Sequence, residues 1–356
     1  MTSASAPTSL RDVIAVAPNI NRNYTGVTAT ICNLVPVQAR AIGMVAMGPN
    51  LPDEVPQLPW RALMSGWSRP PGHRQRIWHA RRKDEAIVGI LLRSLLRQRW
   101  KLVFTAAAAR PKKGFTRFLF RQMDAMIATM PEVADYIDGP STVIMHGVDT
   151  TRFQPAPDRE AAWRATGLPG RYGIGVFGRI RPQKGTDLFV EAMCRLLPRY
   201  PDATAVLSGH IGAEHTGYEG EIRARINEAG LAERIVFLGD LPIDEIPLWY
   251  RRISLYVAPM RWEGFGLTPL EAMASGTAVV STRTGAAHHL IRDGVTGTLV
   301  PAKDIDALTD AIDARLADIE GTLAMGRVAR EHVVAHHSIE REAEAINAVY
   351  AQLWDR

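Results

Sequence analysis

The sequence has few cysteines and no long hydrophobic run. Cys32 and Cys194 are the only cysteines among 356 residues, and they lack metal-ligand spacing. This favours a reducing compartment and argues against a disulfide framework or a zinc site. The most apolar stretch, Ala86–Leu92, is far shorter than the roughly 20 residues of a spanning helix. Met1–Leu10 has no apolar core of a secretory signal. We therefore expect a cytoplasmic protein that contacts membranes only peripherally.

Acidic residues are scarce in one part of the chain. The net charge of the whole chain is +5. Residues 1–165 contain 22 Lys and Arg and 12 Asp and Glu, whereas the remaining residues contain 20 Lys and Arg and 25 Asp and Glu. Between Arg61 and Arg121 there are 16 basic residues, whereas the acidic ones are Asp84 and Glu85 alone. A solvated basic face is the ordinary explanation of a charged run. The imbalance favours instead an anionic partner, such as nucleic acid, anionic lipid or an acidic glycan.

Strand-like apolar runs alternate with helical patterns along the chain, which is typical of parallel βαβ units. The length favours two domains. In the first half, strands are expected at 12–17, 43–47, 101–105, 125–128 and 142–145, and helices at 25–40 and 81–100. The helix at 81–100 is basic and amphipathic, so it is either a membrane-surface element or a core helix with an exposed basic side.

A proline-containing stretch from Gln154 to Arg171 interrupts this pattern and indicates the domain boundary. In the second half, strands are expected at 172–177, 203–208, 234–238, 254–258 and 278–281, with helices between them and from 305 to 354. The sequence therefore predicts an α/β fold with domains at 1–165 and 166–335, followed by a helical segment at 336–356.

The segment from Glu263 to Glu271 has the composition of an anion-binding helix start. Gly264 and Gly266 let the backbone approach a ligand closely, and Glu263 at the strand end can reach a sugar hydroxyl. The free amides of a helix start suit a diphosphate. Ligands also bind at this edge of open α/β sheets.

The same segment carries a helix-capping pattern. Pro269 suits the first helical position, which makes Thr268 the N-cap and Glu271 the partner in a capping box. Glu271 therefore has two interpretations, as a ligand-binding carboxylate or as a cap of its own helix.

A basic loop follows the expected strand at 172–177. It contains Gly178, Arg179, Lys184 and Gly185. Departure of a nucleoside diphosphate develops negative charge, which fixed cations stabilise. Arg179 can fork two phosphate oxygens, and Lys184 acts as a point charge. An ordinary solvated loop is the alternative, but two complementary loops in one domain favour a diphosphate site.

These two loops carry a family resemblance that covers nearly the whole chain. The matching residues are Gly178-Arg179 with Lys184-Gly185, Glu263 to Glu271, His146-Gly-Val-Asp149 with Arg152-Phe153, Arg283-Thr-Gly285 and Asp293-Gly294. In these motifs the chain resembles the retaining glycosyltransferases of family 4. The resemblance implies the GT-B fold, in which two Rossmann-like domains face each other across a cleft and a C-terminal helix crosses back to the N-terminal domain.

The resemblance also implies roles for the matching residues. Arg179 and Lys184 would hold the diphosphate, Glu263 the hydroxyls of the transferred sugar, and Glu271 the ribose. Further donor contacts would come from the loop glycines, the amides of the glycine loop and the segment after the strand at 203–208: Gly178, Phe265, Gly266, Leu267, Thr268, Gly209 and His210. Retaining enzymes of this type need no metal or other cofactor, and the leaving phosphate itself assists the attack of the acceptor.

A narrower resemblance concerns the substrate. Segments around Phe104, Met123–Thr129 and Val143–Asp149 look like those of lipopolysaccharide core mannosyltransferases that use GDP-mannose. The implied acceptor is an anionic glycolipid on the inner face of the cytoplasmic membrane, which fits the basic segment from Arg61 to Arg121. No nucleic acid is expected as a partner.

The acceptor side departs from the family pattern. The N-terminal glycine loop, Asn21–Val27, has one glycine where many relatives have two, and Ala106–Ala109 stand where relatives often have a histidine. Thr25, Gly26 and His146 are the candidates for contacts with the acceptor or a phosphate, although for His146 we favour the alternative that it orders the domain junction.

Several other functions stay open at this stage. One is transfer of another hexose from a UDP-sugar to a different surface glycan. A sugar-nucleotide epimerase or a phosphorylase shares the fold, although nothing marks a pyridoxal lysine. A nucleic-acid binder would use aromatic residues of the basic segment for stacking.

Overall fold

The computed structural model describes residues 9–23 and 25–355 and divides the chain into two compact units. One unit comprises residues up to Gly147 together with Ile339 onward, and the other comprises Val148–Ser338. Most of the stretch Met1–Leu10, where no secretory signal is expected, and Tyr24 of the N-terminal glycine loop lie outside the described residues.

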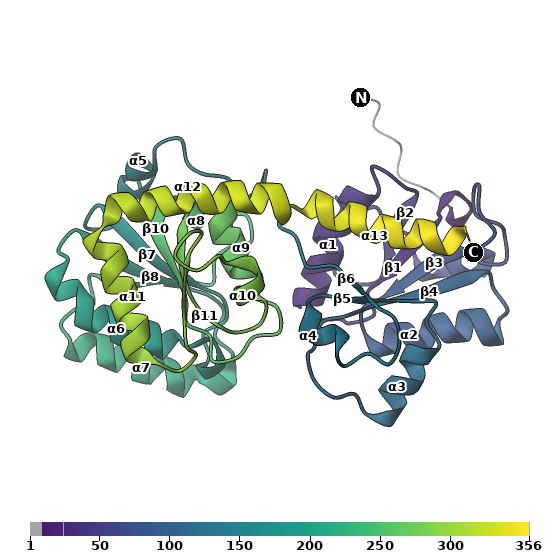
Figure 1. Cartoon of the computed structure of the whole chain (residues 1–356), viewed down its shortest axis with the longest axis horizontal. Coiled ribbons are helices and arrows are strands. Elements are labelled where there is room, and N and C mark those ends of the chain that lie inside the picture. Colours follow the sequence, from purple (N-terminus) through teal and green to yellow (C-terminus); the bar gives the residue numbers. More distant parts are fainter. Residues whose placement is uncertain (1–8, 24, 356) are drawn as a thin grey trace. The chain divides into compact units, whose positions relative to one another are not determined.

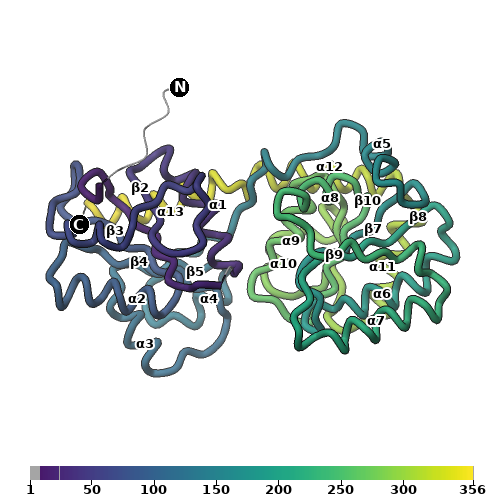
Figure 2. The backbone as a smooth tube through the Cα atoms, turned by 180° about the vertical axis from the view of Figure 1, so that it is seen from behind, coloured from purple at the N-terminus to yellow at the C-terminus, as the bar shows by residue number. Residues whose placement is uncertain are grey.

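The first unit is a parallel six-stranded sheet covered by helices. Its strands, in the order β2-β1-β3-β4-β5-β6, are β1 (Ala15–Pro18), β2 (Met44–Met47), β3 (Arg76–Ala80), β4 (Trp100–Ala106), β5 (Ala125–Ala128) and β6 (Thr142–Val143). Figure 1 shows α1 (Gly26–Gln38) and α13 (Ile339–Trp354) on one face, and α2 (Lys83–Ile90) and α3 (Gly114–Arg121) on the other. Figure 2 shows the same layers from behind. The short helix α4 (Pro131–Ala134) follows β5.

Strand β3 is a central strand that the sequence pattern did not reveal. It pairs with β1 and β4, although it contains Arg76 and His79, which are fully buried. The guanidinium of Arg76 donates to the carbonyls of Leu10 and Val13 at 3.1 and 3.0 Å, which offsets the cost of burying its charge. A period-two hydrophobic pattern does not reveal a strand whose buried polar groups are satisfied from elsewhere in the fold.

The prediction of a single helix at 81–100 is wrong. Helix α2 ends at Ile90, one π-type turn spans Leu91–Leu95, and Trp100 already begins β4. The chain leaves the helix through Arg97, which has a φ of 51°. Arg93 faces the protein, where it donates to Asp124 Oδ2 at 3.0 Å, so the expected basic helical face does not form.

The second unit repeats the architecture with greater regularity. Its parallel strands, in the order β12-β11-β10-β7-β8-β9, are β7 (Tyr172–Phe177), β8 (Ala203–Ser208), β9 (Ile235–Gly239), β10 (Ile253–Ala258), β11 (Ala278–Thr282) and β12 (Thr298–Val300). Its longer helices are α6 (Thr186–Leu196), α7 (Thr216–Glu228), α8 (Ile246–Arg252), α9 (Leu267–Ala274), α11 (Ile305–Ala317) and α12 (Ile319–His336). Strand β12 is the one strand here that the sequence analysis missed.

Residues 148–165 lie with the second unit, whereas the sequence analysis assigned them to the first. Helix α5 (Arg159–Arg164) packs on α8 and on β7. Trp163 is fully buried against Gly173, where an added Cβ would lie 2.3 Å from the indole ring. The prolines around α5 therefore mark a loop within the second unit.

Helix α13 completes the core of the first unit, as the expected C-terminal helix should. Its buried side chains join those of the sheet and of α1 in one cluster, which includes Ile339, Ile346, Tyr350 and Leu353. The Tyr350 hydroxyl lies 2.6 Å from Nδ1 of the buried His79. Among the described residues, no helix combines the length and the apolar character needed to cross a bilayer.

Candidate functional site

The basic loop of the second unit leaves the carboxyl end of β7. Gly178 and Arg179 come directly after the strand, Pro182–Lys184 form one 3-10 turn, and α6 then begins. Gly185 joins the two with a φ of 71°, and an added Cβ would lie 2.0 Å from the carbonyl oxygen of Pro259. Only glycine fits this position. The loop is thereby pressed against the segment that follows β10.

The glycine loop leaves the carboxyl end of the neighbouring strand β10. Helix α9 begins at Leu267, and its N-cap is Gly266, whose φ is 91°. The first-turn amides, among them those of Leu267 and Thr268, have no partner within the helix and suit an anion. Phe265 and Gly266, whose amides are predicted to line the sugar, directly precede this helix, and Leu267 is its first residue.

The prediction of a capping box formed by Thr268 and Glu271 is wrong, because the helix begins without one. The left-handed Gly266 starts the helix before Pro269, and Pro269 is tolerated because the N–H groups of the first turn need no helical partner. Thr268 is inside the helix and does not cap it. Glu271 accepts a hydrogen bond from the Tyr250 hydroxyl at 2.9 Å, so its carboxylate is not used as a cap.

An ion pair joins the two loops. The Lys184 ammonium contacts Glu263 Oε2, and Glu263 Oε1 accepts from the Gly264 amide at 2.9 Å. The two side chains are 20% and 17% exposed, so solvent still reaches both. A small cavity of about 10 Å³ is lined by Gly178 and Lys184 from one loop and by Thr268 from the other. The structure therefore brings the predicted diphosphate and sugar residues together.

Glu271 lies among aromatic side chains beneath the glycine loop. Burial raises the pKa of Glu271, and the hydrogen bond from Tyr250, Arg152 and Lys184 oppose that shift. Burial also raises the pKa of Tyr250, and the negative charge of Glu271 raises it further. The carboxylate is thus held by one hydroxyl in a site of low polarity, where a second donor would be bound strongly.

Arg179 and Arg181 supply further positive charge in the basic loop. Arg179 is exposed, and Arg181 is partly buried beside it. Burial lowers the pKa of Arg181, and the nearby Arg179 lowers it further. Within the described residues, the buried Nε of Arg181 has no hydrogen-bond partner. Arg181 was not among the predicted site residues, although its place between Arg179 and Lys184 was a usable signal.

Gly209 and His210 follow β8, the next strand of the same sheet. The amide of Ile180 in the basic loop donates to the carbonyl of His210 at 3.0 Å. The exposed imidazole of His210 lies 3.1 Å from Asp240 Oδ2. Gly209 and His210 therefore border the basic loop, and their part in a nucleotide pocket stays a prediction.

The acceptor candidates lie in the first unit, where the side chains of Thr25 and His146 each have a structural partner. Thr25 precedes α1, and its hydroxyl accepts from Arg82 Nη2 at 2.7 Å. Gly26 begins α1 and faces open space. His146 Nδ1 lies 2.8 Å from Glu342 Oε1, and Glu342 also accepts from the Gly147 amide. This pairing fits the interpretation of His146 as a residue that orders the end of the first unit.

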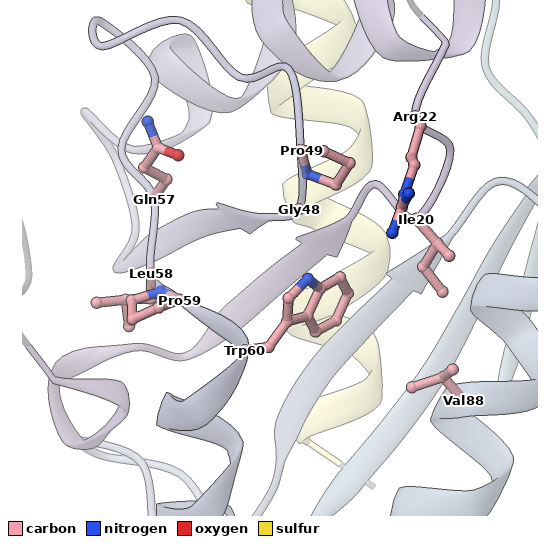
Figure 3. A pocket seen from close by; sticks show the side chains of 9 residues that line it. All are labelled: Ile20, Arg22, Gly48, Pro49, Gln57, Leu58, Pro59, Trp60 and Val88. Atoms are coloured by element: carbon pink, nitrogen blue, oxygen red, sulfur yellow. The ribbon is translucent and has the colours of Figure 1, made fainter.

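A pocket in the first unit was not foreseen. It opens at the carboxyl ends of β1 and β2, has a volume of about 830 Å³, and is shown in Figure 3. The indole of Trp60, 38% exposed, lies between the side chains of Leu58 and Ile20 in this view, and Arg22 points toward the same space. An aromatic face beside a guanidinium suits a sugar ring.

A second pocket of the first unit opens at the carboxyl ends of β3 and β4. Its volume is about 680 Å³. It is lined by Arg81, Arg82, Lys83, Phe104, Thr105, Ala106, Ala107, Ala108, Arg110, Pro111, Lys112, Lys113, Thr116 and Phe120, and we call it the basic pocket. The basic segment predicted from the sequence therefore includes one concave site.

Comparison with known proteins agrees with this geometry. The family model for glycosyl transferases group 1 matches residues 171–318. Over 345 residues the chain is 51% identical to the lipopolysaccharide core biosynthesis mannosyltransferase LpcC of Rhizobium leguminosarum bv. viciae, which covers 97% of both chains. It is 35% identical over 209 residues to the GDP-mannose-dependent alpha-(1-6)-phosphatidylinositol monomannoside mannosyltransferase of Mycolicibacterium smegmatis, covering 54% of this chain and 52% of that one.

Among solved structures, Anabaena HepE in complex with UDP and glucose has a TM-score of 0.76 and covers 95% of this chain and 99% of its own. At 18% identity this likeness concerns the fold alone. Together with the two parallel sheets, it confirms the expected GT-B architecture of Rossmann-like domains.

Proposed function

This chain belongs to the group 1 glycosyltransferases, and from that premise we propose that it transfers mannose from GDP-mannose, with retention of configuration, to an anionic glycolipid of the lipopolysaccharide core. The observation that carries the proposal is the contact between Lys184 and Glu263 beside the first-turn amides of α9. This contact supports the proposal, because cations and amides suit a diphosphate and a neighbouring carboxylate suits the hydroxyls of a sugar.

The chemistry assigned to these residues is stabilisation of the leaving group. The bond between C1 of the sugar and the β-phosphate oxygen breaks, and its electron pair goes to that oxygen. Lys184 and Arg179 then balance the added negative charge. The acceptor hydroxyl attacks C1 from the same face and passes its proton to the departing phosphate oxygen. Glu263 orients the sugar, and Glu271 accepts from the ribose hydroxyls.

The donor assignment rests on the relatives and on the glycine loop. The first curated relative given above is named as a mannosyltransferase and the second as GDP-mannose-dependent. We propose that no metal ion is needed, because Lys184, Arg179 and the helix amides supply the positive charge. Activity that persists in EDTA is the expected result.

A donor screen tests the function. GDP-mannose, UDP-glucose, UDP-GlcNAc and UDP-galactose are compared by thermal shift and by slow hydrolysis, with Glu263→Ala as the variant and the exposed Glu228→Gln as the control. We expect GDP-mannose alone to stabilise the protein, and turnover to fall at least about 100-fold in Glu263→Ala but not in the control. A response to a UDP-sugar instead would establish the alternative hexosyltransferase. The anomer of the product, read by NMR, tests retention.

Peripheral attachment to the inner face of the cytoplasmic membrane is the second part of the proposal. On α3 the side chains of Phe115 and Phe118 are 59% and 55% exposed and share one face at a spacing of three residues. Lys113 and Arg117 flank them, which is the pattern of a helix that lies on an anionic bilayer.

Co-sedimentation with phosphatidylglycerol vesicles tests this contact. The double variant Phe115→Ser/Phe118→Ser should lose most vesicle binding. The exposed Val328→Ser, in the second unit, serves as the control. Equal sedimentation of all three proteins would refute the assignment to α3.

A further inference from the structure

The basic pocket has more positive charge than the surrounding protein balances. Six of its lining residues are Arg or Lys, and none of the described residues that line it is acidic. Beneath it, Glu85 accepts from Arg82 Nη1 at 3.0 Å and from the backbone amides of Arg81 and Arg82. Among the described residues, Arg82 is the one pocket cation whose side chain forms an ion pair with a carboxylate, that of Glu85.

Arg81 and Lys112 have few hydrogen-bond partners within the protein. Arg81 Nη1 donates to the carbonyl of His79 at 3.3 Å, and its buried Nη2 has no hydrogen-bond partner among the described residues. The Lys112 ammonium contacts the carbonyl of Ala108. Burial lowers the pKa of Lys112, and the nearby Arg110 and Lys83 lower it further. An anion in this pocket would relieve repulsion and satisfy donors at once.

The shape of the pocket suits a small ligand with an apolar face. Ala106, Ala107 and Ala108 carry no side chain beyond Cβ, which leaves the space above β4 open. The rings of Phe104 and Phe120, 4.8 Å apart, form an apolar wall. The volume of about 680 Å³ lies within the range of roughly 300–1,000 Å³ found for small-molecule sites. A flat cationic surface for a membrane or nucleic acid would not need such a hollow.

We propose that the basic pocket binds the carboxylate or phosphate substituent of the acceptor saccharide. Its role in acceptor binding rests on the proposed function, whereas its preference for a small anionic ligand follows from the pocket alone. The diphosphate of the donor has its own cations in the second unit, Arg179 and Lys184. Arg82 links the pocket to the start of α1, because it also donates to the hydroxyls of Thr25 and Thr28.

Direct binding of small probes tests this assignment on the full chain. Glucose 6-phosphate and glucuronate are compared with uncharged glucose by calorimetry. The variant Lys83→Ala/Arg110→Ala removes two exposed pocket cations, and Arg69→Ala/Arg99→Ala removes the same charge from exposed positions of the same segment outside the pocket. We expect wild type and control to bind both anionic probes, and the pocket variant to bind them at least about tenfold more weakly.

Three results would overturn the proposal. Equal binding of glucose and the two anionic probes would show that the pocket does not select ligands by their charge. Equal losses in the two double variants would assign the effect to overall charge. Loss of phosphatidylglycerol vesicle binding in the pocket variant, with anionic sugar binding intact, would assign these cations to lipid headgroups.

The outcome is separable from that of the proposed function. If anionic sugars bind in the pocket but no donor is turned over, the pocket stands and the mannosyltransferase proposal fails. If GDP-mannose is turned over but the pocket variant keeps its affinity for the probes, the opposite holds. With turnover established, the pocket variant should raise the acceptor KM and leave the donor KM unchanged.

Discussion

Glu271 is a partly buried carboxylate, and among the described residues the hydroxyl of Tyr250 is the hydrogen-bond donor to it. Burial of a carboxylate costs free energy unless hydrogen bonds offset it. The raised pKa of Glu271 reports this cost, and its sign fixes the pH dependence. A folded-state pKa above the unfolded value means that the native state binds the proton more tightly. The contribution of Glu271 to stability therefore falls as the pH rises from about 4.3 through the raised pKa.

Replacing Glu271 by Gln separates folding from donor binding. The amide keeps a partner for Tyr250 without the partly buried charge, so the free energy of unfolding at pH 8 should stay equal or rise by about 1 kcal/mol. The KM for the nucleotide sugar should rise about tenfold, because a charged acceptor for the ribose hydroxyls is lost. Urea denaturation and initial rates measure the two effects, with Glu228→Gln as the control. An unchanged KM would leave Glu271 a structural residue only.

Single residues also show how far a site can be predicted from sequence. Lys184 and Glu263 were predicted as partners in one site because both follow parallel strands, whose carboxyl ends meet at one sheet edge. Glu271 was harder to interpret, because Thr268 and Glu271 have capping-box spacing and only the conformation of Gly266 decides where α9 starts. The pocket around Trp60 was missed, because a cavity depends on tertiary packing and leaves no local pattern.

At the scale of elements, α5 shows how one side chain fixes a segment in the second unit. The guanidinium of Arg159 contacts the carbonyl of Ile253, donates to Thr277 Oγ1 at 2.7 Å and donates to the carbonyl of Gly276 at 2.7 Å. Burial lowers the pKa of Arg159 to about 10. Its donors satisfy carbonyls at the start of β10 and beyond the end of α9.

Arg159→Met should destabilise the second unit. The methionine keeps much of the apolar stem but removes the arginine donors from these carbonyls and from the Thr277 hydroxyl, so we expect a loss of about 3 kcal/mol in the free energy of unfolding. Arg164→Met on the same helix removes an exposed arginine that pairs with Glu160 and should cost at most about 0.5 kcal/mol. Denaturant unfolding of the two variants checks the difference, and equal effects would contradict the role of Arg159.

The elements of the second unit were more predictable than those of the first. Strands β7 and β8 have the bounds expected from the sequence, because they are short apolar runs between clear turn signals. Strand β3 was missed because Arg76 and His79 interrupt its apolar pattern, and only contacts with distant residues make their burial tolerable. Local patterns cannot report such long-range compensation.

At the scale of the whole molecule, stability should depend on a histidine cluster. Burial lowers the pKa of His337 to about 4, and the neighbouring His332, His336 and Arg292 add to the shift. The unfolded chain, with an ordinary pKa of about 6.5, takes up the proton first. Stability is therefore fully present above about pH 6.5 and is lost as the pH falls toward about 4.

His337→Gln should flatten this pH dependence. Between pH 7.5 and pH 4.5 the wild type should lose about 2 kcal/mol more free energy of unfolding than the variant. The backbone bond from the Val148 amide to the residue 337 carbonyl is unaffected by the substitution. Urea titrations at several pH values measure the slopes. Parallel curves for the two proteins would assign the acid sensitivity to other groups.

The place of α13 in the core of the first unit has a consequence for biosynthesis. On the ribosome, the strands of this unit emerge early, but Ile346, Tyr350 and Leu353 emerge only after residues 148–338 have been made. At about 5–20 residues per second this interval lasts roughly 10–40 s. During that time the face of α1 that α13 covers stays exposed, while the second unit already has all its residues. The half of the chain translated first is thus the last to finish folding, and it is the half a chaperone would need to shield.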